Sequence, residues 1–173
     1  MLGLSGAVVI VGSSVYLGYT YVKYQETRLN RLVEFRNVLK ALQSDIEYSS
    51  RPLSDACIMA GQRAGGYFGQ LFEEYGRQIE EDKELDDPKA LWKSKIAIAS
   101  KELNYDETLK SIYESFVICL GILDRGSQLS NLNVTILDVE TKMNTLREMN
   151  EKRLPVAMKL SVTGGLVLAM ILF

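Results

Sequence analysis

The sequence predicts an all-α protein, with a helical bundle of about six helices between an N-terminal and a C-terminal transmembrane helix. Three observations support this fold class. Residues 1–22 carry no charged side chain, and neither do residues 160–173. Beside both runs, apolar residues recur every three or four positions, which is the spacing of one helix face. No stretch alternates apolar and polar residues convincingly, so we expect no sheet.

The N-terminal run, residues 1–22, is predicted to be a retained transmembrane helix. It is long enough for the roughly 20 residues that a helix needs to cross a bilayer. A secretory signal peptide would begin with basic residues, and none precedes this run. Its small residues would let a second membrane helix approach closely, although weak apolarity without a partner is the alternative. Tyrosines that suit a membrane interface lie at its end: Tyr16, Tyr19, Tyr21 and Tyr24.

The C-terminal run, residues 155–173, is predicted to be a second transmembrane helix. Lys159 lies near its start and would have to extend its amine back to the interface. A peripheral or re-entrant tail is therefore the alternative. Residues 23–154 form the domain between the two runs.

Basic residues flank both runs only on the side of the middle domain. By the positive-inside rule, the middle domain is cytoplasmic and both termini are extracytoplasmic. The predicted localisation is thus a cell membrane, with the lipid bilayer as one partner. The flanking residues are Lys23, Arg28, Arg31, Arg36 and Lys40 after the first run, and Arg147, Lys152, Arg153 and Lys159 before the second.

Two apolar seams predict long helices directly beside the runs. Both helices start from the same membrane face, so an antiparallel pair is the simplest arrangement. The alternative is that each seam faces a shared globular core. The first seam, in a helix over residues 24–49, is Leu32, Phe35, Leu39, Leu42 and Ile46, and the second is Leu129, Leu132, Ile136, Val139, Met143 and Leu146.

Turn residues divide the middle of the chain into shorter helices. Pro52 starts a helix over residues 53–63, because proline is favoured at a first helical position. Gly65-Gly66 ends that helix, and another follows over residues 67–80. Asp87 is predicted to cap a helix that starts at Pro88. The last short helix is expected to be capped by residues 104–106 and to reach Leu123, before a turn at residues 124–127.

Composition argues against catalysis and against nucleic-acid binding. The net charge is −2 and the pI about 5.3, so no basic field attracts nucleic acid. The chain has no histidine, no glycine-rich phosphate loop and no CxxC motif. The acidic run at residues 80–87 lacks the glycine of a metal loop and is read as a solvated connection. Cys57 and Cys119 are read as buried reduced thiols. We therefore predict no catalytic, cofactor or metal site and no enzyme.

Several motifs, in order along the chain, resemble the stage III sporulation protein AB family. Each motif is weak alone, but together they span essentially the whole chain. The matching segments are LKALQSDIEY (39–48) and RPLSDA (51–56) for the N-terminal signature, LGILDR (120–125) with Gln128 for the second, and EKRLP (151–155) leading into Gly164-Gly165 for the final membrane segment.

The resemblance implies a role in endospore formation, in the mother cell membrane that faces the forespore. The family's middle domain is similar to the cytoplasmic domains of the inner-membrane platform protein of type II secretion systems. It implies a non-enzymatic platform component of the mother cell to forespore channel or secretion complex. The implied partners are a cytoplasmic hexameric ATPase, stage III sporulation protein AA, and other proteins of the same complex. A homo-oligomer is left open.

A purely structural membrane-tethered coiled-coil adaptor without an ATPase partner is the alternative function. It would need the seams to continue through the middle, whereas prolines and glycines interrupt them. If the platform interpretation holds, the ATPase is expected at the end of the domain farthest from the anchors. The alternative for Asp55 and Asp124 is that they only cap helices. The candidate partner-binding residues are Glu47, Asp55, Asp124 and Arg125.

Overall fold

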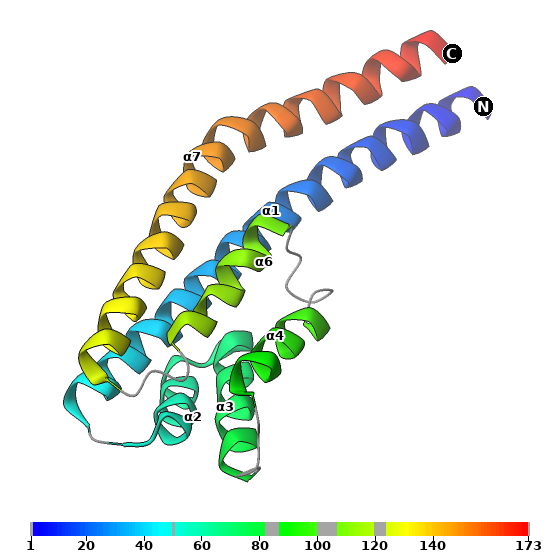
Figure 1. The fold of residues 1–173 in the computed structure, drawn as a ribbon. Coiled ribbons are helices and arrows are strands. Elements are labelled where there is room, and N and C mark those ends of the chain that lie inside the picture. Colours follow the sequence, from blue (N-terminus) through cyan, green and yellow to red (C-terminus); the bar gives the residue numbers. More distant parts are fainter. Residues whose placement is uncertain (1, 50, 82–86, 100–106, 120–123, 173) are drawn as a thin grey trace. The chain divides into compact units, whose positions relative to one another are not determined.

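The computed structural model describes residues 2–49, 51–81, 87–99, 107–119 and 124–172 (Figure 1). Within these ranges it has six α-helices, one 3₁₀ helix and no strand, which confirms the all-α prediction. The elements are α1 (Leu2–Tyr48), α2 (Leu53–Ala64), α3 (Gly66–Glu81), α4 (Pro88–Ile98), α6 (Glu107–Glu114), η1 (Ser115–Cys119) and α7 (Arg125–Leu172).

The chain forms two compact units, which we call the central unit and the terminal unit. The central unit is Asn30–Met143. The terminal unit joins Met1–Leu29 to Asn144–Phe173, the two ends of the sequence. Both units contain parts of α1 and α7, and each unit is described by itself below.

Aromatic side chains from five elements form the core of the central unit. The Trp92 ring on α4 lies 4.8 Å from the Phe72 ring and 4.9 Å from the Phe116 ring, centroid to centroid. Its indole N–H donates a 2.9 Å hydrogen bond to the backbone oxygen of Tyr113, so the polar end of this buried side chain is satisfied. The fully buried aromatic residues are Phe35, Phe68, Phe72, Tyr75, Trp92, Tyr113 and Phe116.

Helices α2 and α3 pack closely because glycines line their contact. A Cβ added at Gly61 would lie 2.4 Å from the backbone oxygen of Gly69, and one added at Gly76 would lie 2.6 Å from that of Ser54. The connection between the helices uses positive φ angles at Gly65 and Gly66, +64° and +70°, which favour glycine. The helix break predicted at this Gly-Gly pair is confirmed.

In the central unit, α1 and α7 run antiparallel, as their seams predict. The Lys40 ammonium pairs with the Glu140 carboxylate at 2.6 Å, and the Gln43 amide donates to Asn133 at 2.8 Å. The residue number rises from 40 to 43 on α1 while that of the partner falls from 140 to 133 on α7, which is the order expected for antiparallel helices. The seam residues Leu32, Phe35, Leu39 and Leu42 on α1 and Leu132, Val139 and Met143 on α7 are all buried.

The starts of α3 and α4 are capped by carboxylates, one distant and one local. The Asp87 carboxylate accepts from the Lys89 N–H at 2.8 Å, which confirms the predicted cap. For α3 the acceptor is Glu34, which lies on α1 and takes the Tyr67 N–H at 3.0 Å. Arg31 donates to both oxygens of Glu34, at 3.0 and 2.9 Å, and its guanidinium lies over the Tyr67 ring.

The last short helix differs from its prediction. α6 ends at Glu114, and the chain continues as the 3₁₀ helix η1, where the Ser115 hydroxyl donates to the Ile112 oxygen at 2.6 Å. Phe116, in η1, is fully buried beside Phe72 and Trp92. We attribute the tighter turn to the placement of this ring. The predicted cap at residues 104–106 and residues 120–123 of the second motif lie outside the described residues.

In the terminal unit, α1 and α7 approach through glycine and serine. The Ser14 hydroxyl donates to the Ser161 backbone oxygen at 2.5 Å. A Cβ added at Gly18 would lie 2.5 Å from the Ser161 Oγ, and one at Gly165 would lie 2.9 Å from the Ser14 Cβ. The small residues of the first run therefore do have a close partner helix, which is the other end of the same chain.

The structure gives one helix, at Arg125–Ile171, that is long and apolar enough to cross a membrane by its length and composition, within the residues it describes. Its best window has a mean hydropathy of 1.8 and is almost entirely unburied. α7 continues through Pro155, so the predicted boundary between the middle domain and the second transmembrane helix lies within one unbroken helix. Proline removes one backbone hydrogen bond there, and the remaining turns hold the helix. Crossing by the N-terminal run stays a prediction.

Candidate docking surface

Three of the four predicted partner-binding residues lie together in the central unit, where α1 ends and α7 begins. The Arg125 guanidinium donates to the backbone oxygen of Glu47. Asp124 directly precedes Arg125 in the sequence. The carboxylates of Glu47 and Asp124 therefore belong to a residue that makes this bond and to one next to it. The side chain of Glu47 is not needed for the contact, because its main chain is the acceptor. We call Glu47, Asp55, Asp124 and Arg125 the distal surface.

Asp124 is the N-cap of α7. Its Oδ2 accepts from the Ser127 N–H at 2.7 Å, and its backbone oxygen accepts from the Gln128 N–H at 3.0 Å. The Ser127 N–H favours the charged carboxylate and holds the pKa of Asp124 below its usual range. The capping interpretation is therefore confirmed for Asp124, and the residue stays charged at neutral pH.

Asp55 has a different environment from the other three residues. It lies in the first turn of α2, beside a hollow of about 230 Å³ that Arg51, Ile58 and Met59 also line. The N-cap position of α2 is Pro52, which makes no side-chain cap bond. The expectation that Asp55 caps a helix is thus wrong, because it sits three residues inside. It can still interact with the helix dipole. Among the described residues, no hydrogen bond or ion pair joins it to Glu47, Asp124 or Arg125.

Sequence reasoning missed an ion pair beside this surface. The Arg63 guanidinium near the end of α2 pairs with the Asp45 carboxylate on α1 at 3.0 Å. The Asp45 side chain is only 12% exposed, whereas that of Arg63 is 52% exposed. The two positions are far apart in sequence, so no local pattern could have indicated the pair. It fixes the end of α2 against the end of α1.

Glu47, Asp124 and Arg125 of the distal surface are exposed to solvent. Tyr48, which the sequence analysis did not single out, is 82% exposed beside Glu47, and exposed tyrosine and arginine are enriched at protein interfaces. Among the described residues no group of three His, Cys, Asp or Glu could hold a metal. The thiols of Cys57 and Cys119 are buried as predicted, and burial raises the pKa of both.

Comparisons with known proteins agree with one another. Residues 3–173 match the family described as Stage III sporulation protein AB. A relative named Stage III sporulation protein AB, from Bacillus subtilis (strain 168), is 25% identical over 172 residues, covering 99% of both chains. A solved structure of a Stage III sporulation protein AB covers 72% of this chain and 97% of its own, with a TM-score of 0.62 and 22% identity. That structural likeness concerns the fold alone.

Proposed function

Because the chain belongs to the stage III sporulation protein AB family, we propose that it is a membrane platform component of the mother cell to forespore complex in endospore formation. In this role it is non-enzymatic and docks a cytoplasmic hexameric ATPase, stage III sporulation protein AA, through the distal surface. The central unit lies in the cytoplasm and both termini lie on the other side of the mother cell membrane.

The observation that carries this proposal is the continuity of α7. One helix, Arg125–Leu172, starts at the charged turn of the distal surface and ends in the segment apolar enough to cross a membrane. A protein that binds the turn is thereby connected to the membrane anchor through helical backbone. A platform needs this connection between a cytoplasmic partner and the bilayer.

The arrangement of the central unit favours a platform over a tether. A coiled-coil tether buries its seams only between two long helices. Here the Phe35 ring of the α1 seam lies 4.9 Å from Phe68 on α3 and 5.3 Å from Tyr113 on α6. The seam thus serves a globular core as well as the antiparallel pair. A globular domain offers the broad surface that a partner protein requires.

The test is recovery of the ATPase with the full-length protein from sporulating mother-cell membranes. Glu47→Lys is the cleanest variant, because the bond from Arg125 ends on the backbone of residue 47 and survives the change. Asp124→Asn is the second variant, since asparagine removes the charge and still caps a helix. Both should reduce recovery several-fold while helicity and melting temperature stay near those of the parent.

The matched control is Asp138→Lys, which reverses an exposed charge on α7 away from the turn. It should leave recovery unchanged. If Glu47→Lys and Asp138→Lys behave alike in folded protein, the distal surface is not the docking site. If the parent never recovers the ATPase, the platform role fails and the tether becomes the better interpretation.

A further inference from the structure

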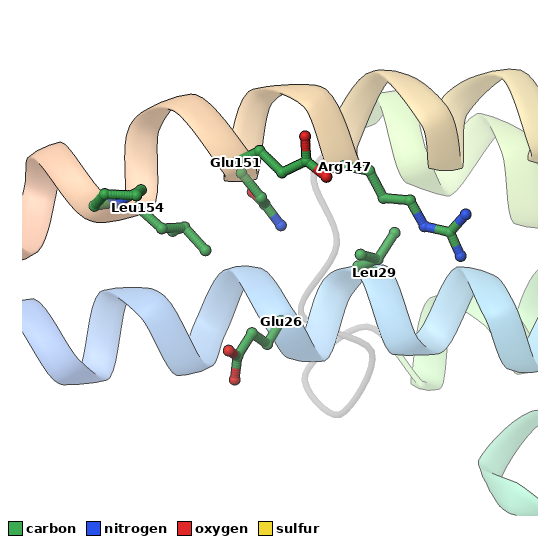
Figure 2. Close-up of a pocket in the computed structure, with 7 residues that line it drawn as sticks. Glu26, Leu29, Arg147, Glu151 and Leu154 are labelled. Carbon is green, nitrogen blue, oxygen red and sulfur yellow. The ribbon is translucent and has the colours of Figure 1, made fainter.

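A groove in the terminal unit lies between α1 and α7 (Figure 2). Its volume of about 460 Å³ falls within the range of roughly 300–1,000 Å³ that is usual for small-ligand sites. Leu29 on α1 and Leu154 on α7 point into the space between the helices, whereas Glu26 points away from it (Figure 2). The lining residues are Glu26, Leu29, Arg147, Asn150, Glu151, Leu154 and Pro155.

Two polar side chains of the groove, Arg147 and Asn150, are donors that suit an anion, and the carboxylates of Glu26 and Glu151 also line it. Arg147 extends from α7 beside Leu29 (Figure 2), and the Asn150 side chain also lines the groove. Guanidinium and amide N–H groups are donors that match phosphate oxygens. In the part of the chain that the structure describes, no carboxylate forms an ion pair with the Arg147 guanidinium. Its charge is therefore available to a ligand.

The charge of the whole terminal unit points in the same direction. Its residues include six basic and three acidic side chains, a net charge of +3, whereas the central unit has 14 basic and 19 acidic ones, a net charge of −5. Basic residues beside a membrane attract anionic lipids by about 1 kcal/mol each. Of the two units, only the terminal one is complementary to an anionic surface.

The groove also lies directly beside an exposed apolar surface. Along α7, Pro155 is followed by Val156 and Leu160, which are 52% and 67% exposed. Such side chains are suited to contact with acyl chains. A ligand with an anionic head and apolar tails would thus find donors at Arg147 and a continuous apolar path beyond Leu154.

We propose that this groove binds an anionic phospholipid of the surrounding membrane. Its phosphate lies against Arg147 and Asn150, and its acyl chains follow Leu154 and the apolar face of α7. The proposal rests on the membrane anchoring in the proposed function, but not on the ATPase. Its consequence is that one annular lipid becomes a defined part of the protein.

The test uses the full-length protein in detergent, titrated with phosphatidylglycerol or phosphatidylcholine and followed by native mass spectrometry. Phosphatidylglycerol should bind more tightly. Arg147→Gln should weaken it about fivefold, as expected for the loss of one basic residue at an anionic surface. Asn150→Leu, which removes the donor at similar size, should also weaken it. The matched control is Arg153→Gln, which removes the same charge from an exposed position outside the groove.

Equal losses from Arg147→Gln and Arg153→Gln would show diffuse charge attraction and overturn the groove. Equal binding of both lipids by the parent would also overturn it. Membrane flotation separates this proposal from the anchoring on which it rests. A chain that floats with vesicles but shows no lipid preference contradicts the groove alone, whereas a chain that does not float contradicts the anchoring and the groove together. ATPase recovery is a separate measurement and decides neither.

Discussion

The α2–α3 pair of the central unit and the α1–α7 pair of the terminal unit are held at close range by the same means. In both, a Cβ on a glycine would meet the opposite helix, at 2.4 Å for Gly61 and 2.5 Å for Gly18. The surroundings differ. α2 and α3 belong to a unit whose aromatic core is fully buried, whereas the terminal helices carry exposed apolar residues such as Leu17 and Leu160.

This difference indicates what drives each contact. In water, burial of the aromatic core supplies the free energy, and the glycines only set how closely the helices approach. In the bilayer that the proposed function assigns to the terminal unit, lipid is as apolar as the side chains, so packing and interhelical hydrogen bonds must hold the pair. The bond from Ser14 to Ser161 has this character. Substitutions should therefore cost more in the central unit than in the terminal unit.

The largest effect is expected from Trp92→Ala. Removal of a fully buried tryptophan costs about 3–5 kcal/mol of unfolding free energy. Trp92→Phe keeps an aromatic ring and loses the hydrogen bond to Tyr113, for a smaller loss. Denaturant unfolding followed by circular dichroism measures both. Equal losses for the two variants would mean that the hydrogen bond, and not ring burial, dominates at this site.

Gly61→Ala comes next. Its Cβ would press against the backbone oxygen of Gly69, which cannot rotate away, so we expect a loss of about 1–3 kcal/mol. Gly126→Ala is the control, because its closest neighbour is a side-chain oxygen of Asp124 at 3.4 Å, and it should change stability by less than about 0.5 kcal/mol. A neutral Gly61→Ala would show that α2 and α3 can move apart freely.

In the terminal unit, Gly18→Val should lower the melting temperature of the detergent-solubilised chain, with a cost of about 1 kcal/mol. Gly12→Val has no neighbour within 4 Å of its added Cβ and should be neutral. The sole tryptophan, Trp92, reports on the central unit, and its fluorescence should stay unchanged in both variants. A changed Trp92 signal would mean that the two units do not respond separately.

The smallest effect concerns alkaline pH. Burial raises the pKa of Cys119 to about 11, partly offset by its contact with Thr135. Because the folded thiol keeps its proton at a pH where the unfolded one loses it, stability should fall as the pH rises toward 11. Cys119→Ala should make this fall shallower in denaturant unfolding at several pH values. A parent and variant with identical pH profiles would contradict the prediction.

Local signals in the sequence predicted most helix boundaries. Pro52, Gly65-Gly66 and Asp87 mark them because each acts through its own backbone or the adjacent turn. Contacts between distant residues had no such signal. The Asp45–Arg63 pair and the groove between Leu29 and Leu154 depend on segments that only the tertiary structure brings together. The distal surface was predictable only in part. The sequence indicated that Asp124 caps a helix, but it did not indicate the hydrogen bond from Arg125 to Glu47.

The distant cap at the start of α3 has a consequence for the order of folding. The Tyr67 N–H is satisfied by Glu34, which is held in place by Arg31 on α1. The first turn of α3 therefore cannot complete its hydrogen bonds until α1 is present as a helix. During synthesis α1 emerges before α3, so the Glu34 carboxylate is already present when α3 forms. A fragment that starts after residue 49 would lack it, and its α3 should fray at the first turn.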